Sequence, residues 1–260
     1  MLRSSSGKIG RVLITNDDGI DAKGLAILEE IATGIADEVW VFAPDDNCSG
    51  YGRSLTLKRE LKVTHHGERR MTCDGTPTDC MILALNHFMN DTRPDLVLSG
   101  INLGMNVADD ITCSGTIGAA WEAVVHGVPA IALSQKYSIE IPRDNPDVFA
   151  AAGAHAGNVI RMLLAEGWPE GVIMNVNFPS LPADEVKGIK PIMVGRHKNS
   201  DDVMPGSGEN TYRIGMARQR LDVEEGTDIG ALLDGHIALC PLSINMTDRE
   251  FLGTLTQKIA

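Results

Sequence analysis

The sequence predicts an α/β fold with a Rossmann-like, doubly wound and mostly parallel sheet. Short apolar runs typical of buried strands recur along the chain, from residue 11 to residue 178. Segments with apolar residues at helical spacing separate them. The first strand, helix and strand together take about 35 residues, which is the length of a βαβ unit and implies parallel strands.

This first unit starts with an apolar strand at residues 11–16. A helix is expected from Asp21 to about Thr33, with Asp21 as its N-cap and Gly34 as its stop. Residues 38–44 form the second strand.

The same patterns place the remaining elements of the core. Residues 54–74 alternate between apolar and polar side chains, which favours short antiparallel strands and leaves His65 and His66 in solvent. Further strands are expected at 94–99, 129–134, 172–178 and 236–241, and helices at 78–89, 115–126 and 147–166.

The last third of the chain is less regular. Residues 189–194 and 211–214 are interpreted as two arms of an extended excursion. Residues 196–210 between them are rich in Gly, Asp, Ser and Asn, so a mobile loop is expected. There is neither an internal repeat nor a clear linker. The sequence therefore predicts one domain over residues 1–260, with an irregular extension or hairpin at about 186–235.

Composition and charge narrow the range of functions. The chain has 260 residues, of which 43% are hydrophobic and 22% charged, as in a globular protein. Its net charge of −12 argues against a nucleic-acid polymer or an anionic membrane as partner, because both require basic patches. A small anionic substrate is still possible where local donors or a metal reverse the field.

Targeting signals and cysteine usage favour the cytoplasm. No run approaches the roughly 18 apolar residues of a membrane helix. Residues 1–10 lack the apolar segment of a secretory signal and are expected to be a short loose tail. The five cysteines are odd in number and have no C-x-x-C spacing, so we expect small buried thiols in a reducing compartment.

The clearest chemical signal is Asn16-Asp17-Asp18-Gly19, at the end of the first strand. Two adjacent carboxylates at the mouth of a buried strand repel each other and are costly to desolvate. A divalent cation resolves both problems, and carboxylate oxygens suit Mg²⁺ or Mn²⁺. The alternative is an ordinary turn, for which Asp-Gly is a common pair.

Two more strand ends are polar, and ligands of doubly wound sheets bind beyond such ends. After the second strand, Ser49 or Asn47 offers a neutral oxygen to the same metal, although the segment is also typical of a plain loop. After the strand at 94–99, Asn102 offers a carbonyl oxygen, and the two glycines nearby allow a backbone to approach a ligand.

A phosphate-sized site is predicted next to the metal. Ser114-Gly115-Thr116 precedes a helix, and its hydroxyls either cap that helix or, with the exposed N–H groups, hold a phosphate. Dinucleotide, P-loop and nucleophile-elbow motifs are absent. A hard cation beside an anion site argues for metal-assisted hydrolysis of a phosphate ester.

The chain resembles the SurE (survival protein E) family of metal-dependent 5′/3′-nucleotidases. The resemblance runs in order over residues 12–242. Its strongest stretches are residues 13–20 (LITNDDGI), 43–50 (APDDNCSG) with 54–56 (SLT), 74–80 (DGTPTDC), 99–106 (SGINLGMN), 114–120 (SGTIGAA) and 129–134 (PAIALS), and weaker ones are 175–179, 227–228 and 241–242.

This resemblance implies one divalent cation per subunit, Mg²⁺ or Mn²⁺, held by Asp17, Asp18, Ser49 and Asn102. It implies hydrolysis of nucleoside monophosphates, with some members also acting on short polyphosphate. It further implies a C-terminal extension that joins subunits into a homodimer or homotetramer.

Combining the resemblance with the residues gives a hypothesis for the site. Asp17 and Asp18 are the catalytic carboxylates. Donors around Ser114, Gly115 and Thr116, with Asn106, bind the phosphate. Direct attack by water and a phosphoenzyme both remain open.

Four positions depart from the usual family pattern: Gly52 and Arg53 in the metal loop, Leu103 after Asn102, and Cys113 before Ser114. The segment at 196–212 fits only loosely. No departure removes a predicted metal ligand, and we expect these positions to affect substrate preference.

Two alternatives belong to other classes. A Ca²⁺-dependent nucleoside hydrolase also has an Asp cluster after its first strand, but usually with more Asp residues than occur here. A nucleotide-binding or assembly protein without turnover would keep the fold and lose catalysis; the intact ligand set argues against it.

Overall fold

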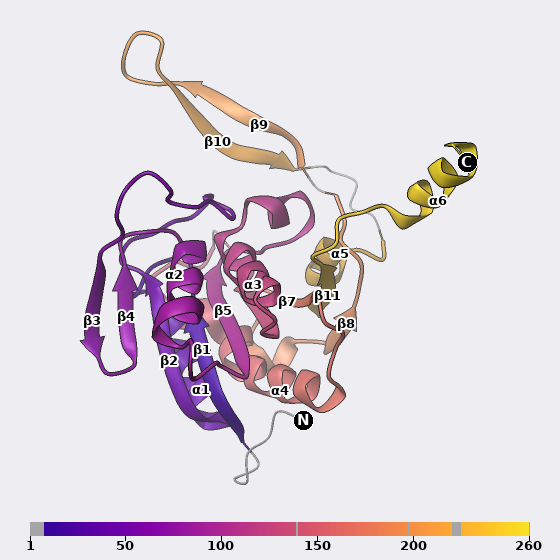
Figure 1. Ribbon diagram of the computed structural model, residues 1–260. Coiled ribbons are helices and arrows are strands. Elements are labelled where there is room, and N and C mark those ends of the chain that lie inside the picture. The colour runs from indigo at the N-terminus through magenta and orange to yellow at the C-terminus, as the bar shows by residue number, and fades with distance from the viewer. Residues whose placement is uncertain (1–7, 139, 197, 220–224, 260) are drawn as a thin grey trace.

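The computed structural model describes residues 8–138, 140–196, 198–219 and 225–259. In this described part, a nine-stranded sheet lies between two layers of helices, and a two-stranded hairpin stands away from it (Figure 1). The expected N-terminal tail lies largely outside the described residues.

The strand order in the sheet is β3-β4-β2-β1-β5-β6-β7-β11-β8. The β3–β4 and β7–β11 pairs are antiparallel, and the other pairs of this sheet are parallel. The strands span Ile9–Thr15 (β1), Ala36–Pro44 (β2), Val63–Gly67 (β3), Arg70–Cys73 (β4), Leu96–Leu103 (β5), Ala130–Gln135 (β6), Val172–Phe178 (β7), Ile189–Pro191 (β8) and Ile237–Ser243 (β11).

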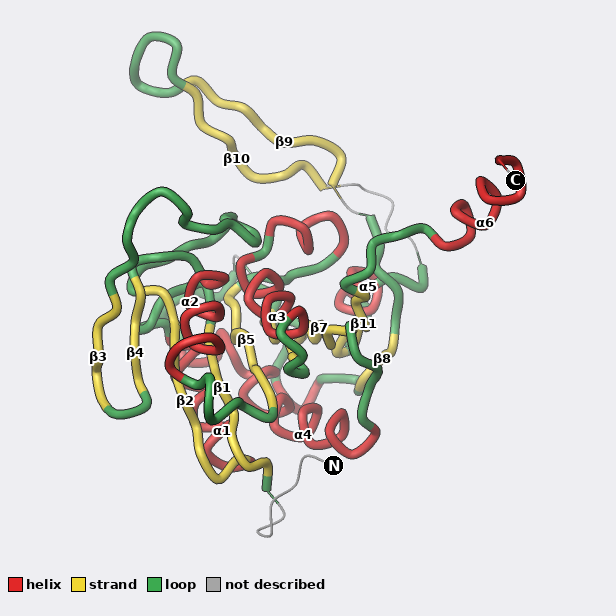
Figure 2. The backbone as a smooth tube through the Cα atoms, viewed as in Figure 1, coloured by secondary structure: helices red, strands yellow, loops and turns green. Residues whose placement is uncertain are grey.

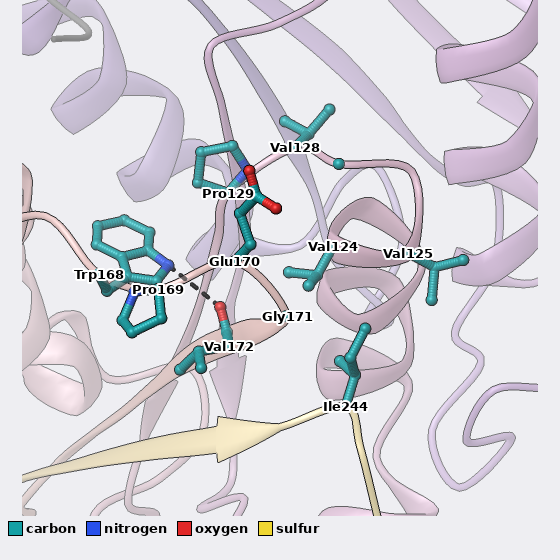
Figure 3. A pocket seen from close by; sticks show the side chains of 11 residues that line it. Val124, Val125, Val128, Pro129, Trp168, Pro169, Glu170, Gly171, Val172 and Ile244 are labelled. Atoms are coloured by element: carbon teal, nitrogen blue, oxygen red, sulfur yellow. Dashed lines mark hydrogen bonds between the residues drawn. The ribbon is translucent and has the colours of Figure 1, made fainter.

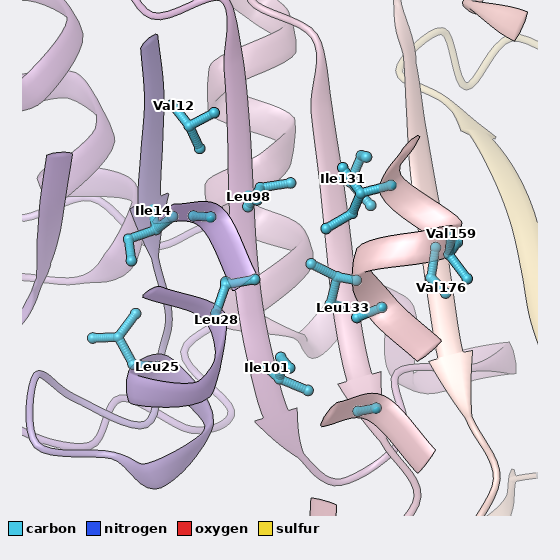
Figure 4. Packing of buried hydrophobic residues seen from close by; sticks show 14 of the residues in the cluster. Val12, Ile14, Leu25, Leu28, Leu98, Ile101, Ile131, Leu133, Val159 and Val176 are labelled. Atoms are coloured by element: carbon cyan, nitrogen blue, oxygen red, sulfur yellow. The ribbon is translucent and has the colours of Figure 1, made fainter. Parts of the chain in front are cut away.

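Helices α1 (Lys23–Ile35) and α4 (Ala150–Glu166) cover one face of the sheet. Helices α2 (Pro77–Leu83) and α3 (Gly115–Val125) cover the other. Side chains alternate between these faces along each strand. Val12 and Ile14 pack under α1 and α4 (Figure 4), whereas Leu13 packs under α2 and α3. Burial on both faces explains why these strands are continuously apolar in sequence.

Short helical segments and two C-terminal helices complete the chain (Figure 2). These are the π-helical turn η1 (Ala84–Phe88), the 3₁₀ turns η2 (Ala108–Cys113), η3 (Pro146–Phe149) and η4 (Ala183–Glu185), and helices α5 (Asp228–Leu233) and α6 (Arg249–Ile259). Residues 147–166, which contain α4, are long and apolar enough to cross a membrane. However, 44% of the 18-residue apolar window within this segment is buried inside the protein. Since α4 packs on α1 and β6, we interpret it as a core helix.

The predicted fold class is confirmed, and the strand expected at 172–178 matches β7 in both bounds. Helix α1 begins two residues later than expected, after Ala22, so the interpretation of Asp21 as N-cap is wrong. Between residues 54 and 62 no strand forms, because a loop that passes over α2 occupies this segment. Four of the cysteines are buried as expected, but Cys113 is exposed.

The prediction of a mobile loop at 196–210 is wrong. Strands β9 (Lys198–Pro205) and β10 (Tyr212–Gln219) pair antiparallel over this region, and the turn between them is closed by Gly206 and Thr211. Cross-strand backbone hydrogen bonds order this polar sequence, and single-segment composition does not show such bonds. Helices α5 and α6 were not predicted at all.

The topology fixes where a ligand can bind. Chain order runs outward from β1 in both directions, towards β2 on one side and β5 on the other. A doubly wound sheet has its binding crevice at such a switch point, beyond the carboxyl ends of the strands. Asp17 and Asp18 follow β1 at this crevice.

Candidate active site

The carboxyl end of β1 places Asp17 inside the protein and Asp18 at its edge. The side chain of Asp17 is only 4% exposed. Its Oδ1 accepts a hydrogen bond of 2.6 Å from the Thr116 hydroxyl in the first turn of α3. A Cβ atom at Gly115 would come within 2.7 Å of the Asp17 Cβ, so only glycine lets the start of α3 approach this carboxylate.

Burial changes the titration of both carboxyl groups. The pKa of Asp17 is raised to about 6, chiefly by burial, while the hydrogen bond from Thr116 opposes this rise and the negative charge of Asp18 contributes to it. Burial also raises the pKa of Asp18, opposed by the backbone N–H of Leu103 and by the positive charge of Arg143. Two carboxylates that resist ionisation side by side are the arrangement that a cation stabilises.

The side chain of Asp18 is oriented by two neighbouring segments. Its Oδ2 accepts a 3.2 Å hydrogen bond from the N–H of Leu103, at the end of β5. Its Oδ1 faces the Asn47 amide nitrogen at 3.4 Å, in the loop that follows β2. The three strand ends predicted to form one site therefore meet around Asp18.

The loop after β2 is fastened directly to the carboxylate pair. The N–H of Cys48 donates to the Asp17 carbonyl at 2.7 Å, which brings Ser49 to the same edge. The Asn47 side chain accepts from the N–H of Ser49 at 2.8 Å, so Asn47 shapes the loop as well as contacting Asp18.

The far end of this loop is held against α3 by two of the positions that depart from the family pattern. The N–H of Gly52 donates to the Cys113 carbonyl at 3.0 Å. Arg53 forms an ion pair of 2.6 Å with Glu122, which is buried. Arg53 therefore anchors the loop on α3 through a buried carboxylate.

Asn102 lies where β5 bulges. Pairing with β6 is regular up to Ser99 and then resumes with Asn102 opposite Ser134, so an extra residue is inserted into β5. Gly100 makes this bend possible, because a Cβ there would lie 2.2 Å from the Leu133 carbonyl oxygen. The Asn102 amide nitrogen donates to the Gly104 carbonyl, which leaves its side-chain oxygen as an available ligand.

The donor set fits a hard divalent cation. In the described part of the chain no group of three or more His, Cys, Asp or Glu side chains is arranged for a metal. A cation at this edge would therefore rely on two carboxylates together with neutral oxygens, a set typical of Mg²⁺ or Mn²⁺ and unsuited to zinc. The raised pKa of Asp17 supports this fit, because a bound cation would offset the cost of burying the ionised carboxylate.

The four residues predicted to bind phosphate have different surroundings. The Ser114 hydroxyl accepts a hydrogen bond from the N–H of Ile117 and caps α3. Of the two roles considered for this hydroxyl, helix capping and phosphate binding, the structure shows the first. The Thr116 hydroxyl donates to the Asp17 carboxylate. Gly115 has no side chain and so lets the start of α3 lie close to Asp17. The Asn106 amide donates to the Ser134 hydroxyl at 2.8 Å inside the protein.

Sequence reasoning missed the side chains that hold these segments in place. The side-chain amides of Asn175 and Asn177, in β7, donate to the backbone carbonyl of Asn106. The backbone N–H of Asn106 donates in turn to the side-chain oxygen of Asn177. Two asparagines within an otherwise apolar strand were the available signal. Asp79 accepts from the N–H groups of Thr56 and Thr76, which ties the loop after β2 to the start of α2.

A hollow lies at the opposite end of the parallel strands from Asp17 and Asp18 (Figure 3). Its volume is about 320 Å³, and its walls are mainly apolar, with Val124 of α3, Pro129 before β6, Trp168 and Ile244 among them. Glu170 is the single ionisable side chain among its lining residues. Since it sits at the amino ends of β6 and β7, it is remote from the switch point.

The doubly wound sheet and the paired carboxylates at its switch point define a Rossmann-like α/β protein with an acidic site. The family model described as "Survival protein SurE" matches residues 12–201. The chain belongs to this family.

Curated relatives and a solved structure agree with this assignment. The chain is 42% identical over 251 residues to the 5′-nucleotidase SurE of Azorhizobium caulinodans, covering 95% of this chain and 98% of the relative. It is 44% identical over 248 residues to the 5′-nucleotidase SurE of Paramagnetospirillum magneticum, covering 94% of each. A crystal structure of the SurE protein from Aquifex aeolicus superposes with a TM-score of 0.82 at 33% identity, covering 96% of this chain and 100% of that one.

Proposed function

We propose that this protein is a divalent-metal-dependent phosphomonoesterase that hydrolyses nucleoside 5′- and 3′-monophosphates to nucleoside and phosphate. The observation that carries the proposal is the buried Asp17 beside Asp18, held by the first turn of α3 at the switch point of the sheet. The relatives named 5′-nucleotidase SurE support the choice of substrate class.

Asp17, Asp18, Ser49 and Asn102 would hold one cation per subunit, Mg²⁺ or Mn²⁺. When bound, such an ion polarises a phosphoryl oxygen and lowers the pKa of water. The role of Thr116 is to keep the Asp17 carboxylate ionised and aimed at the crevice, since its hydroxyl donates to one of the two oxygens.

The phosphoryl group would lie against the beginning of α3. Its first-turn N–H groups and the helix dipole favour negative charge there. Gly115 allows the close approach, and Ser114 fixes the helix end, while both the hydroxyl and the backbone N–H of Thr116 interact with Asp17. Asn106, locked to β6 and β7, supports the adjacent loop.

The departures Gly52, Arg53, Leu103 and Cys113 are proposed to tune substrate preference. Leu103 contributes its N–H to Asp18, and Gly52 contacts Cys113, whose side chain is exposed just before α3. A site open at this end would also accept short polyphosphate.

We also propose that the chain works as a homodimer or homotetramer in the cytoplasm. Support comes from apolar side chains that the single chain leaves uncovered. These are Val203, Met204, Tyr212 and Ile214 on the hairpin and Phe251, Leu252, Leu255 and Ile259 on α6. The free thiols support a reducing compartment.

Phosphate release from a panel of nucleoside 5′- and 3′-monophosphates, with Mn²⁺ or Mg²⁺ and after EDTA, tests the proposal. We expect release that requires metal and differs between nucleotides. Nucleotide binding without release under any metal would instead identify a binding protein, and release of free base from a nucleoside would identify a nucleoside hydrolase.

A further inference from the structure

The loop after β2, which carries Ser49, has a backbone that depends on its attachments. Gly50 and Gly52 have φ angles of +80° and +56°, a left-handed conformation that glycine adopts readily. Two such residues give the loop little stiffness of its own. At its near end the N–H of Cys48 donates to the Asp17 carbonyl at 2.7 Å. The position of Ser49 is therefore set by this contact and by whatever holds the far end.

The far end of the loop packs directly on the backbone of α3. The N–H of Gly52 donates to the Cys113 carbonyl, just before the helix, at 3.0 Å. A Cβ atom at Gly118 would lie 2.7 Å from the Gly52 carbonyl oxygen, so glycine is required for this close approach. Glu122 lies four residues further along the same helix face, where it meets Arg53. One face of α3 thus receives the loop.

The carboxylate of Glu122 is a fixed attachment point. It is buried, and its Oε2 accepts hydrogen bonds from Nη2 and Nε of Arg53 at 2.6 and 3.0 Å. Its Oε1 lies 3.4 Å from Nδ1 of His126, and the Asn86 amide nitrogen lies 3.0 Å from Nε2 of that ring. Both oxygens of the carboxylate therefore have neighbours that restrict its orientation, and the rigid fork of the arginine is held in turn.

We propose that Glu122 is a positioning residue for the metal site, because through Arg53 it fixes the loop that brings Ser49 to the cation. Helix α3 would then set two of the four proposed ligands. The hydroxyl of Thr116 donates to Asp17 at the start of the helix, and Glu122 holds the loop of Ser49 further along it. Ligands held in place before the cation arrives lose less conformational freedom when it binds. This inference rests on the proposed function, because it concerns the same cation.

Amide hydrogen exchange of the metal-free protein tests the positioning without any catalysis. In Glu122→Gln and in Arg53→Gln, peptides covering residues 47–53 should exchange several-fold faster, while β1 and β5 exchange as in the wild type. Arg11→Gln is the matched control, because it breaks the ion pair with Glu38 near the amino end of β1 and should leave exchange in the loop unchanged. Unchanged exchange of the loop in both test variants would contradict the proposal.

Calorimetric titration with Mn²⁺ measures the consequence for the site. Glu122→Gln and Arg53→Gln should each bind Mn²⁺ about tenfold more weakly, as expected for residues that orient a ligand without touching the metal. Arg53→Lys should lie between these variants and the wild type, because lysine keeps the charge but loses the planar fork. Arg11→Gln should bind Mn²⁺ like the wild type. Wild-type Mn²⁺ affinity in both Glu122→Gln and Arg53→Gln would overturn the proposal.

A double-mutant cycle with Ser49 tests the route of the effect. In a Ser49→Ala background, Glu122→Gln should cost little further Mn²⁺ affinity, because the loop no longer supplies a side-chain ligand. The same loss of affinity in both backgrounds would show that the carboxylate acts by another route and would contradict the proposal. If the wild type hydrolysed no nucleotide, the proposed function would fail, while hydrogen exchange and the Mn²⁺ titration would still decide the role of Glu122.

Discussion

Apolar side chains are buried in the sheet but exposed on the β9–β10 hairpin and on α6. From β1 to β7, apolar residues lie in two continuous clusters on the faces of the sheet. The β9–β10 hairpin and α6 project away from the sheet (Figure 1). Their apolar side chains are exposed, and Ile214 is 82% exposed. The sheet region has its own hydrophobic core and carries the candidate site at the carboxyl ends of its strands. The hairpin and α6 expose apolar side chains that contact with another chain would cover.

The first prediction concerns the edge of the core. Asp18→Asn removes a carboxylate that contacts both β5 and the loop after β2, so we expect nucleotidase activity to fall on the order of a thousandfold. Asp21→Asn is the matched control, because it makes the same charge change three residues away at an exposed position. Equal activity of the two variants would remove Asp18 from the site.

The second prediction concerns the cost of Asp17 in metal-free protein. The pKa of Asp17 in the folded protein, about 6, exceeds its ordinary value of 3.8, so the folded state binds the proton more tightly than the unfolded state. The contribution of this proton to the stability of the fold is complete below pH 3.8 and is lost as the pH rises through about 6. The difference corresponds to roughly 3 kcal/mol. In EDTA, Asp17→Asn should therefore be more stable than the wild type at pH 8, and the gap should close towards pH 4.

Urea unfolding of both proteins at several pH values measures this gap. Asp21→Asn again serves as the control and should follow the wild type. A wild-type protein that matched Asp17→Asn at every pH would mean that burial does not disfavour the ionised carboxyl.

The third prediction separates two hydroxyl groups at the start of α3, those of the N-cap Ser114 and of Thr116. Thr116→Val removes the donor to Asp17 and should lower activity roughly tenfold, because one charge-assisted hydrogen bond is lost. Ser114→Ala removes the helix cap and should cost about 1 kcal/mol of stability with a smaller effect on activity. Steady-state rates and thermal unfolding of both variants check the contrast, and the reverse pattern would contradict it.

Sequence patterns predicted the core well because its strands are buried on both faces. Residues 172–178 are apolar enough to locate β7 without any tertiary information. The hairpin buries little within this chain, so burial left no such pattern in its sequence. Helix α6 does carry apolar residues at helical spacing, namely Phe251, Leu252, Leu255 and Ile259, and the sequence analysis did not use this signal. Composition then favoured a loop where β9 and β10 pair.

The site shows the same limit at the level of single residues. Three polar strand ends could be predicted to meet, because parallel strands align their carboxyl ends. The sequence could not decide which of Ser114 and Thr116 caps the helix and which serves Asp17.

The smallest effect on the core is expected from the hairpin. Ile214→Ser should shift the protein towards smaller assemblies while changing the free energy of unfolding of the core by less than about 0.5 kcal/mol. Light scattering after size-exclusion chromatography measures the assembly, and Glu209→Gln at the exposed hairpin turn is the control. A wild type that is monomeric at every concentration would refute the proposed role of the hairpin.

Calorimetric titration with Mn²⁺ tests most directly whether the acidic edge at the switch point is the functional centre. The wild type and Asp21→Asn should each bind one ion per chain, and Asp18→Asn should bind none in the same concentration range. Binding by Asp18→Asn with wild-type affinity and stoichiometry would contradict the assignment of the site.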